Sequence, residues 1–308
     1  MKETISLNEK IAPTRTDSLP TKKQLIINYY EKAGRDYHTW SKKYNMHFGY
    51  FEKGMNPFVR EAMLEKLNEN VLQRLEIDTS SFATIADFGC GLGATLRHGV
   101  KKFPNANFKG ITLVPWQVEQ AKDLIAGDPD FKPGTIEIIE GDYCNTPFAT
   151  NSLDGVVAIE SSCYARGDNK SDLLKEIHRV LKPGGRFTIS DGFIKKPLPE
   201  SGILRQAYQK LCSSWALTEL GNIHDVHRYL KHLDFQNLSI EEISMRVAPS
   251  VAHVPFTVIY FLLKEFLFGK EPMNKERWDN LKSPLLTMIL GSARSHFGYY
   301  FISGTKSK

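Results

Sequence analysis

The chain of 308 residues is long enough to bury one large core and carry a cap, and 41% of its residues are hydrophobic. Its 40 Lys and Arg against 35 Asp and Glu leave a net charge of +5, and the lysines are scattered in pairs. This composition excludes intrinsic disorder, a collagen-like chain and a coiled coil. It also weighs against a dedicated nucleic-acid-binding protein, in which basic residues usually gather on one face.

The cysteines and histidines do not have the spacing of a disulfide framework or a metal site. The cysteines form no C-x-x-C pair, and in a chain this long they indicate free thiols in a reducing compartment. His224, His227 and His232 do not share one tight helical face, so no metal is expected. The four cysteines are Cys90, Cys144, Cys163 and Cys212.

No targeting or membrane-spanning segment is expected from the sequence. Residues 1–25 carry charged side chains and no apolar run, unlike a secretory signal peptide. The most apolar stretch, residues 251–263, contains His253 and Pro255 and is too short to cross a bilayer. We therefore expect a soluble cytoplasmic protein. Peripheral membrane contact and the choice between monomer and homodimer stay open.

The N-terminal part predicts a tail followed by helices. Residues 1–22 are polar and are expected to form a flexible tail. An aromatic-rich helix over 23–44, a turn at 47–51 and a helix over 57–75 follow, with apolar residues at helical spacing. We expect residues 23–78 to form an N-terminal helical cap.

The next section alternates short apolar runs with helical patterns, which predicts an α/β fold with a doubly wound, mostly parallel sheet. We expect this core to span 79–245, a helical cap insertion to span 246–295, and the last strand to lie within 296–308. The predicted strands are 82–88, 108–113, 135–139, 155–159, 186–190, 238–245 and 297–303, and the predicted core helices are 93–102, 116–126, 170–181, 202–219 and 224–233.

A glycine-rich loop is the sharpest local feature. The buried run ending at Phe88 leads into Gly89, Gly91 and Gly93, and a helix begins near Ala94. Glycines there let the backbone approach a ligand that faces the helix N-terminus. The same spacing of residues also matches the dinucleotide-binding fingerprint, which is weak evidence when it stands alone.

Further features distinguish these possibilities. Asp87 stands two residues before the first glycine, Gly141-Asp142 follows the third strand, and Leu181-Lys182-Pro183-Gly184-Gly185 precedes the fifth. In this order the motifs resemble the class I S-adenosylmethionine-dependent methyltransferases, closely over residues 80–192. Residues 110–117, 140–148 and 158–165 are most similar to the branch of sterol C-methyltransferases and tocopherol methyltransferases. The resemblance implies a seven-stranded Rossmann-like sheet and S-adenosyl-L-methionine as the cofactor.

The resemblance also implies which residues hold the cofactor. The glycines and Asp87 would hold its methionine part, Asp142 would hydrogen-bond the adenine amino group, and Tyr143 would lie beside the ring. Thr112 stands where many relatives carry a ribose-binding acid, and Gln117 is expected to compensate. The full set expected to bind cofactor is Asp87, Gly89, Cys90, Gly91, Gly93, Thr112, Leu113, Gln117, Gly141, Asp142, Tyr143 and Glu160.

Candidate catalytic and substrate residues come from the strand ends and the aromatic flanks. Glu160 ends an apolar strand, where desolvation would raise its pKa and suit it to act as a base or to stabilise a cation. His47 is a candidate proton shuttle, and Tyr164 is a third candidate for the chemistry. The aromatic residues expected to line an apolar substrate site are Tyr29, Tyr37, Trp40, Tyr50 and Phe256.

These features predict a methyltransferase that acts on a small, largely apolar metabolite such as a sterol, prenyl chain or prenylated quinol, through C-methylation. The alternative within the class is N- or O-methylation of a polar amine, phenol or alkaloid. A nicotinamide-dependent oxidoreductase is disfavoured because Thr112 replaces the ribose-binding acid. A non-catalytic cofactor-sensing protein is disfavoured by Glu160 and the long cap.

Overall fold

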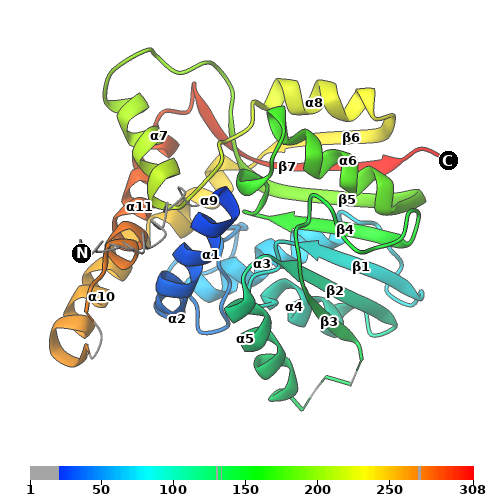
Figure 1. Cartoon of the computed structure of the whole chain (residues 1–308), viewed down its shortest axis with the longest axis horizontal. Helices are drawn as coiled ribbons and strands as arrows, with labels where there is room; N and C mark the ends of the chain where they lie inside the picture. The colour runs from blue at the N-terminus through cyan, green and yellow to red at the C-terminus, as the bar shows by residue number, and fades with distance from the viewer. Residues whose placement is uncertain (1–20, 130, 133, 270–271) are drawn as a thin grey trace, which may run out of the picture.

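A seven-stranded sheet forms the centre of the molecule, and the predicted doubly wound α/β class is confirmed (Figure 1). The computed structural model describes residues 21–129, 131–132, 134–269 and 272–308. The strand order is β3-β2-β1-β4-β5-β7-β6, with β7 antiparallel to both of its neighbours. The strands are β1 (Ala83–Phe88), β2 (Ala106–Thr112), β3 (Ile136–Glu140), β4 (Leu153–Ile159), β5 (Leu181–Ile194), β6 (Phe235–Glu242) and β7 (Phe297–Lys306).

Helices cover both faces of this sheet, which explains why its central strands read as continuous apolar runs. On one face, α3 (Arg60–Gln73), α4 (Ala94–Lys102) and α5 (Pro115–Ala126) pack against a core that includes Ile85 and Val157. On the other face, α6 (Ser171–Val180) and α8 (Ile223–His232) bury Leu173, Ile177, Val226 and Leu230.

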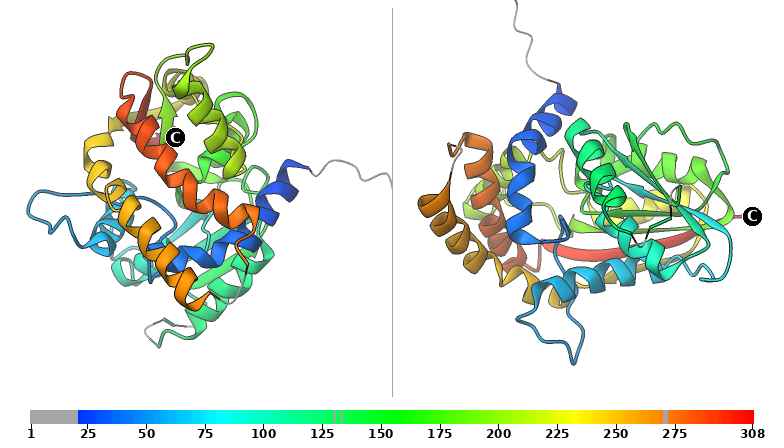
Figure 2. Two further views of the ribbon diagram at one scale, coloured as in Figure 1. Left: turned by 90° about the vertical axis from the view of Figure 1, so that its left-hand side faces the viewer. Right: turned by 90° about the horizontal axis from the view of Figure 1, so that it is seen from below.

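The remaining helices form a cap beside the sheet. They are α1 (Lys22–Ala33), α2 (Tyr37–Trp40), α7 (Ile203–Ser214), α9 (Ser244–Val251), α10 (Val254–Phe268) and α11 (Lys275–Ser292). In Figure 2, α1 stands between the outer cap helices and the sheet. Buried ion pairs join the cap: Arg277 of α11 contacts Asp36 and Glu265, each at 2.9 Å.

The observed packing changes the predicted domain boundaries. We expected α3 to belong to the N-terminal cap, but Leu67, Val71 and Leu72 are fully buried against the sheet core. We expected α7 to belong to the core, but it packs along α11 in the cap. The predicted tail falls largely outside the described residues. Its last residue, Lys22, begins α1, whose N-cap is Thr21.

Two further elements differ from the prediction. The helix expected over 23–44 breaks into a short 3-10 turn at Gly34–Asp36 and ends at Trp40, because Ser41 has extended backbone. Within the described residues, Ser244–Phe268 is one helical stretch of 25 residues, long and apolar enough to cross a bilayer by length and composition alone. The expectation of a stretch too short to cross a bilayer rested on residues 251–263, which are only part of this helical region.

Candidate functional site

A small niche of about 80 Å³ lies at the carboxyl ends of β1, β2 and β4. Ligands of doubly wound folds collect at this edge of the sheet. Ile26 and Tyr30 of α1 and Met46 cover the niche. The predicted cofactor residues that line it are Asp87, Gly89, Cys90, Gly91, Thr112, Leu113, Gln117, Tyr143 and Glu160.

The glycine loop has the left-handed backbone that its residues allow. Gly89, Gly91 and Gly93 have φ of 86°, 52° and 73°, values that side chains disfavour. A Cβ on Gly89 would lie 2.4 Å from Ser161 Cβ, and one on Gly91 would lie 3.3 Å from Met46 Sδ. Gly93 caps the start of α4 and does not line the niche.

Asp87 supplies a carboxyl group that the protein itself leaves unpaired. The residue is buried and lines the niche, and no described residue donates a hydrogen bond to its carboxylate. Burial raises the pKa of this carboxyl to about 7. A cationic or amine-bearing ligand in the niche would stabilise its ionised form.

The second strand orients an amide toward the same niche. Thr112 Oγ1 donates to Gln117 Oε1 at 2.6 Å, and both residues are buried. This bond fixes the amide and leaves its NH₂ group as a donor. The donor set therefore fits the nucleoside cofactor that the sequence implies. The niche is smaller than the ~300 Å³ usual for a ligand site.

The structure places the predicted adenine-binding pair differently. Gly141 and Asp142 lie outside the lining of the niche, and Asp142 Oδ2 lies 2.9 Å from both Lys23 Nζ and Arg166 Nη2. These ion pairs occupy the carboxylate that was expected to meet the adenine amino group. Tyr143 does line the niche, and its hydroxyl donates to Ser161 O at 2.6 Å.

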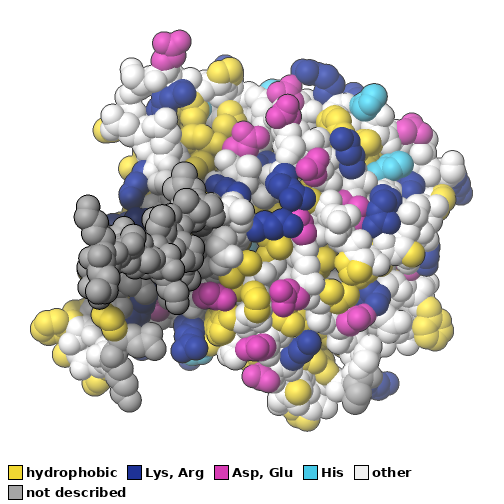
Figure 3. Space-filling view, in the orientation of Figure 1, with side chains coloured by type: hydrophobic (Ala, Val, Ile, Leu, Met, Phe, Trp, Pro, Cys, Tyr) yellow, Lys and Arg dark blue, Asp and Glu magenta, His cyan; other side chains and the backbone are white. Residues whose placement is uncertain are grey.

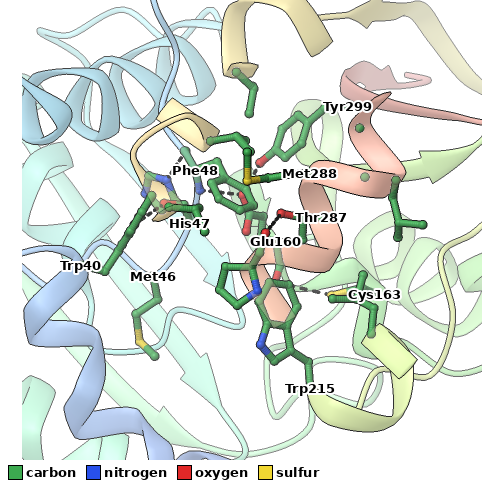
Figure 4. Close-up of a pocket in the computed structure, with 18 of the residues that line it drawn as sticks. Trp40, Met46, His47, Phe48, Glu160, Cys163, Trp215, Thr287, Met288 and Tyr299 are labelled. Carbon is green, nitrogen blue, oxygen red and sulfur yellow. Dashed lines mark hydrogen bonds between the residues drawn. The ribbon is translucent and has the colours of Figure 1, made fainter. Parts of the chain in front are cut away.

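A much larger cavity, of about 480 Å³, adjoins the niche (Figure 4). Its walls are mostly apolar side chains from α2, α7, α9, α10 and α11. Trp40, Phe48, Trp215, Met288 and Tyr299 are among the residues that line the cavity. The residues that line both spaces are Tyr30, Met46, His47, Glu160 and Tyr164.

The predicted substrate residues divide into two groups. Tyr37 and Trp40 line the cavity, as expected. Tyr29 lies behind them, where its hydroxyl donates to Asn280 Oδ1 at 2.8 Å. Tyr50 is buried in the core, stacked on Phe301, and Phe256 faces solvent from α10. The structure therefore does not place Tyr50 or Phe256 at the cavity, because Tyr50 packs in the core and Phe256 lies on the outer face of α10.

Glu160 stands at the junction of the niche and the cavity. The backbone N–H of Phe48 and the hydroxyl of Tyr299 both donate to its Oε1, each at 2.7 Å. No described residue bonds to Oε2. Burial raises the pKa of this carboxyl to about 8, and its backbone holds a φ of 45°. A strained, desolvated acid with one free oxygen is typical of a functional site.

His47 and Tyr164 are held by other protein groups. The ring nitrogens of His47 lie 2.7 Å from Phe48 O and 3.0 Å from Asn68 Oδ1, so neither is free to carry a proton to a substrate. Burial lowers the pKa of His47 to about 4. The Tyr164 hydroxyl bonds that of Tyr30 at 3.0 Å, and burial raises its pKa. Both residues shape the junction, and Glu160 alone keeps a free ionisable oxygen there among the three candidates.

Sequence reasoning missed Tyr299, the partner of Glu160. It lies on β7, whose alternation of Phe297, Tyr299 and Phe301 was read only as a strand. It also missed Asp191, which lines the cavity and accepts hydrogen bonds from Ser162 Oγ at 2.6 Å and from Cys163 N at 3.1 Å. The helical patterns alone could not indicate that the last strand returns beside β5 and meets Glu160.

Comparison with known proteins finds methyltransferases among the relatives of this chain. Residues 86–189 match the family model described as a methyltransferase domain. The chain is 32% identical over 168 residues to cycloartenol-C-24-methyltransferase 1 of Oryza sativa subsp. japonica, covering 54% of this chain and 45% of that protein. It is 27% identical over 209 residues to O-methyltransferase resE of Aspergillus sclerotiorum, covering 66% and 73%. The chain thus spans about half the length of the plant relative.

Solved structures share the fold over nearly the whole chain. The geranyl diphosphate C-methyltransferase from Streptomyces coelicolor A3(2) has a TM-score of 0.67 at 15% identity, covering 96% of this chain and 100% of that one. The [4+2]-cyclase SpnF has a TM-score of 0.69 at 18% identity, covering 94% and 97%. At these identities the likeness establishes the fold alone.

Proposed function

We propose that this chain, which carries a class I S-adenosylmethionine-dependent methyltransferase domain, methylates a small, uncharged and largely apolar metabolite bound in the 480 Å³ cavity. The main support for the proposal is that the niche and the cavity share lining residues. Glu160, Tyr30 and Met46 line both, so an acceptor in the cavity would meet the contents of the niche at Glu160.

The niche is suited to S-adenosyl-L-methionine, which supplies an electrophilic methyl group when bound. Asp87 and the amide of Gln117 would hold it, and the turn at Gly89 and Gly91 lets the backbone approach it. Its positive charge would lower the raised pKa values of Asp87 and Glu160 and keep both carboxylates ionised at neutral pH.

The charges around the cavity favour an uncharged acceptor. Among the described residues that line it, Arg277 is the one Lys or Arg side chain, and Asp36 and Glu265 already pair with it. A diphosphate would find no uncompensated cation there. A sterol, a prenyl chain or a prenylated quinol would instead bury apolar surface against the cap, which also excludes water from the reaction.

C-methylation gives Glu160 a specific task. Adding a methyl to a carbon–carbon double bond leaves a carbocation, and loss of a proton restores the double bond. The free Oε2 of Glu160 would take that proton, and the rings of Tyr30, Tyr37 and Trp40 would stabilise the cation beforehand. The similarity to plant and fungal sterol methyltransferases supports this reading.

O-methylation is the second candidate, and the similarity to fungal O-methyltransferases favours it. Glu160 would then accept the proton of an acceptor hydroxyl. This version needs a polar atom on the acceptor beside Oε2, whereas C-methylation needs only the double bond.

Methyl-labelled S-adenosylmethionine with a panel of sterols, prenyl quinols, phenols and amines tests the proposal. Label that partitions into the organic phase would support methylation of an apolar acceptor, and mass spectrometry of the product would distinguish a new C-methyl group from a methyl ether. Label confined to polar products would overturn the apolar assignment. S-adenosylhomocysteine binding measured in the same preparation separates a missing acceptor from a missing cofactor site.

A further inference from the structure

The outer face of α10 is apolar along its whole length. Residues that share this face at helical spacing are all exposed, and Phe256 and Phe266 expose 73% and 87% of their surface. The opposite face anchors the helix: Val254 and Phe261 are buried, and Glu265 pairs with Arg277. The exposed apolar residues of the outer face are Phe256, Ile259, Tyr260, Leu263, Phe266 and Leu267.

Helix α11, which packs beside α10, extends this apolar surface. Trp278, Leu285, Met288 and Ile289 of α11 are exposed. Figure 2 shows the two helices side by side on the outside of the cap, and Figure 3 shows hydrophobic side chains at the projecting end of α10. We call these four residues and the six on α10 the apolar cap face.

Near the apolar cap face, the described acidic side chains are paired, whereas some of the lysines are not. Each described acidic side chain of α10 and α11 is engaged: Glu265 with Arg277, Glu276 with Lys32, and Asp279 with Lys275 and Lys210. Lys264 and Lys282 have no acidic partner among the described residues, and Lys282 Nζ lies 5.0 Å from the Trp278 ring. The uncompensated charge at the edge of this face is therefore positive.

We propose that the apolar cap face docks onto the surface of a membrane that contains anionic lipids. Its phenylalanine and leucine side chains would enter the boundary between headgroups and acyl chains, and Lys264 and Lys282 would meet lipid phosphates. A second copy of the chain would offer these lysines no unpaired carboxylate on the described part of α10 and α11, which disfavours self-association through this face. The anchored inner face of α10 favours a helix lying in the interface over one that spans the bilayer.

This placement also gives an apolar acceptor a route, a step that rests on the proposed function. Val258 of α10 and Leu281 of α11 line the cavity on the inner side of the helices that carry the apolar cap face. Met288 both lines the cavity and is exposed. A lipid-soluble acceptor would pass from the membrane between α10 and α11 without crossing water.

Flotation of the full chain with phosphatidylcholine vesicles, with and without phosphatidylglycerol, tests the docking without cofactor or acceptor. We expect binding that increases with phosphatidylglycerol and weakens with salt. The double variant Phe256→Gln/Phe266→Gln should reduce partitioning at least about tenfold, since each ring loses most of its burial in lipid. The single variants Phe266→Gln and Phe82→Gln form a matched pair, since the two rings expose 87% and 89% of their surface and Phe82 lies directly before β1. Phe266→Gln should weaken binding, and Phe82→Gln should bind as the wild type does.

Two double variants that reverse lysine charges test the same docking surface independently. Lys264→Glu/Lys282→Glu should abolish the preference for phosphatidylglycerol, whereas Lys122→Glu/Lys231→Glu, on α5 and α8, should keep it. Trp278 fluorescence should shift to the blue on adding vesicles, and Trp278→Phe should remove that shift.

Absence of flotation, or a loss in Phe82→Gln equal to that in Phe266→Gln, would overturn the docking surface. A dimer in sedimentation analysis that only Phe256→Gln/Phe266→Gln dissociates, without vesicle binding, would assign the face to a second copy instead. None of these outcomes depends on methyl transfer, so a failure here is distinguishable from a failure of the proposed function.

Discussion

Tyr299 on the last strand donates its hydroxyl proton to Glu160 Oε1 at 2.7 Å, joining two residues that are 139 positions apart. The Phe48 N–H donates to the same oxygen. Both bonds hold Oε1, and no described residue bonds to Oε2; Figure 4 shows Glu160, Phe48 and Tyr299 together in the wall of the cavity. This arrangement separates the role of Glu160 from that of its partner and makes both testable.

Glu160→Gln should leave the dissociation constant of S-adenosylhomocysteine nearly unchanged and lower turnover by ~10²-fold or more, the usual contribution of a general base. Gln keeps the shape and the two accepted hydrogen bonds but cannot take a proton. Calorimetric titration and single-turnover label transfer measure the two quantities. Unchanged turnover would remove Glu160 from the chemistry.

Tyr299→Phe should raise the midpoint of the pH dependence of kcat/KM. The hydrogen bond from Tyr299 stabilises the ionised carboxylate, so its removal raises the pKa of Glu160 further. We expect the variant to recover activity at higher pH, which a purely structural defect would not allow. A pH profile that keeps its midpoint but loses amplitude would contradict this role.

Stability of the cofactor-free protein should fall as the pH rises from about 5 to 9. Burial raises the pKa of Asp87 to about 7 and of Glu160 to about 8, against ordinary values near ~4. The folded chain therefore binds more protons than the unfolded chain in this range. The stabilisation from the protonated acids is complete below the unfolded pKa and is lost as the pH rises through the folded one. Melting curves of Asp87→Asn and Glu160→Gln should be flatter with pH than those of the wild type.

Gly91→Val should abolish cofactor binding in a protein that still folds. Gly91 has a φ of 52° and lines the niche, so a branched side chain both strains the loop and occupies ligand space. Gly184→Val is a matched control, because Gly184 has a φ of 82° with open space around it, away from the niche. Equal binding by the folded Gly91→Val protein would contradict the placement of the cofactor.

Arg277→Ala should lower the free energy of unfolding by about 1.5–3 kcal/mol, since it removes charge-assisted hydrogen bonds from a buried guanidinium to the half-buried carboxylates of Asp36 and Glu265. Arg228→Ala, which removes an exposed pair with Asp225, should cost about 1 kcal/mol at most. Denaturant unfolding curves compare the two. Similar losses would mean that the buried pairs do not hold the cap.

Much of the core was predictable because its signals are local. Each of these signals consists of neighbouring residues: the apolar strands that end at Phe88 and Ile159, and the glycines that follow Phe88. The resemblance based on them is confirmed by the matching domain model. The fold class followed from the alternation of strands and helices. Most of the residues predicted to bind the cofactor line one niche, because parallel strands end at the same edge of the sheet.

The cap was harder because its contacts are long-range. Nothing near Tyr50 in the sequence indicates that it stacks on Phe301, and nothing near Asp142 indicates its ion pairs with Lys23 and Arg166. The apolar pattern of α10 does not reveal which of its faces turns inward. The register of β7, which places Tyr299 beside Glu160, depends on antiparallel pairing with β5 across the whole cap insertion.

The most direct test of the central claim, that an apolar acceptor reacts in the cavity beside Glu160, is label transfer by Gly192→Phe. Gly192 lines the cavity from β5, and a Cβ there would meet no atom within 4 Å, so a phenyl ring would fill acceptor space and leave the niche intact. The account predicts that wild type transfers label to an apolar acceptor, and that Gly192→Phe loses at least about tenfold in transfer with unchanged S-adenosylhomocysteine affinity. Equal transfer by the variant, or transfer by the wild type to polar acceptors alone, would contradict it.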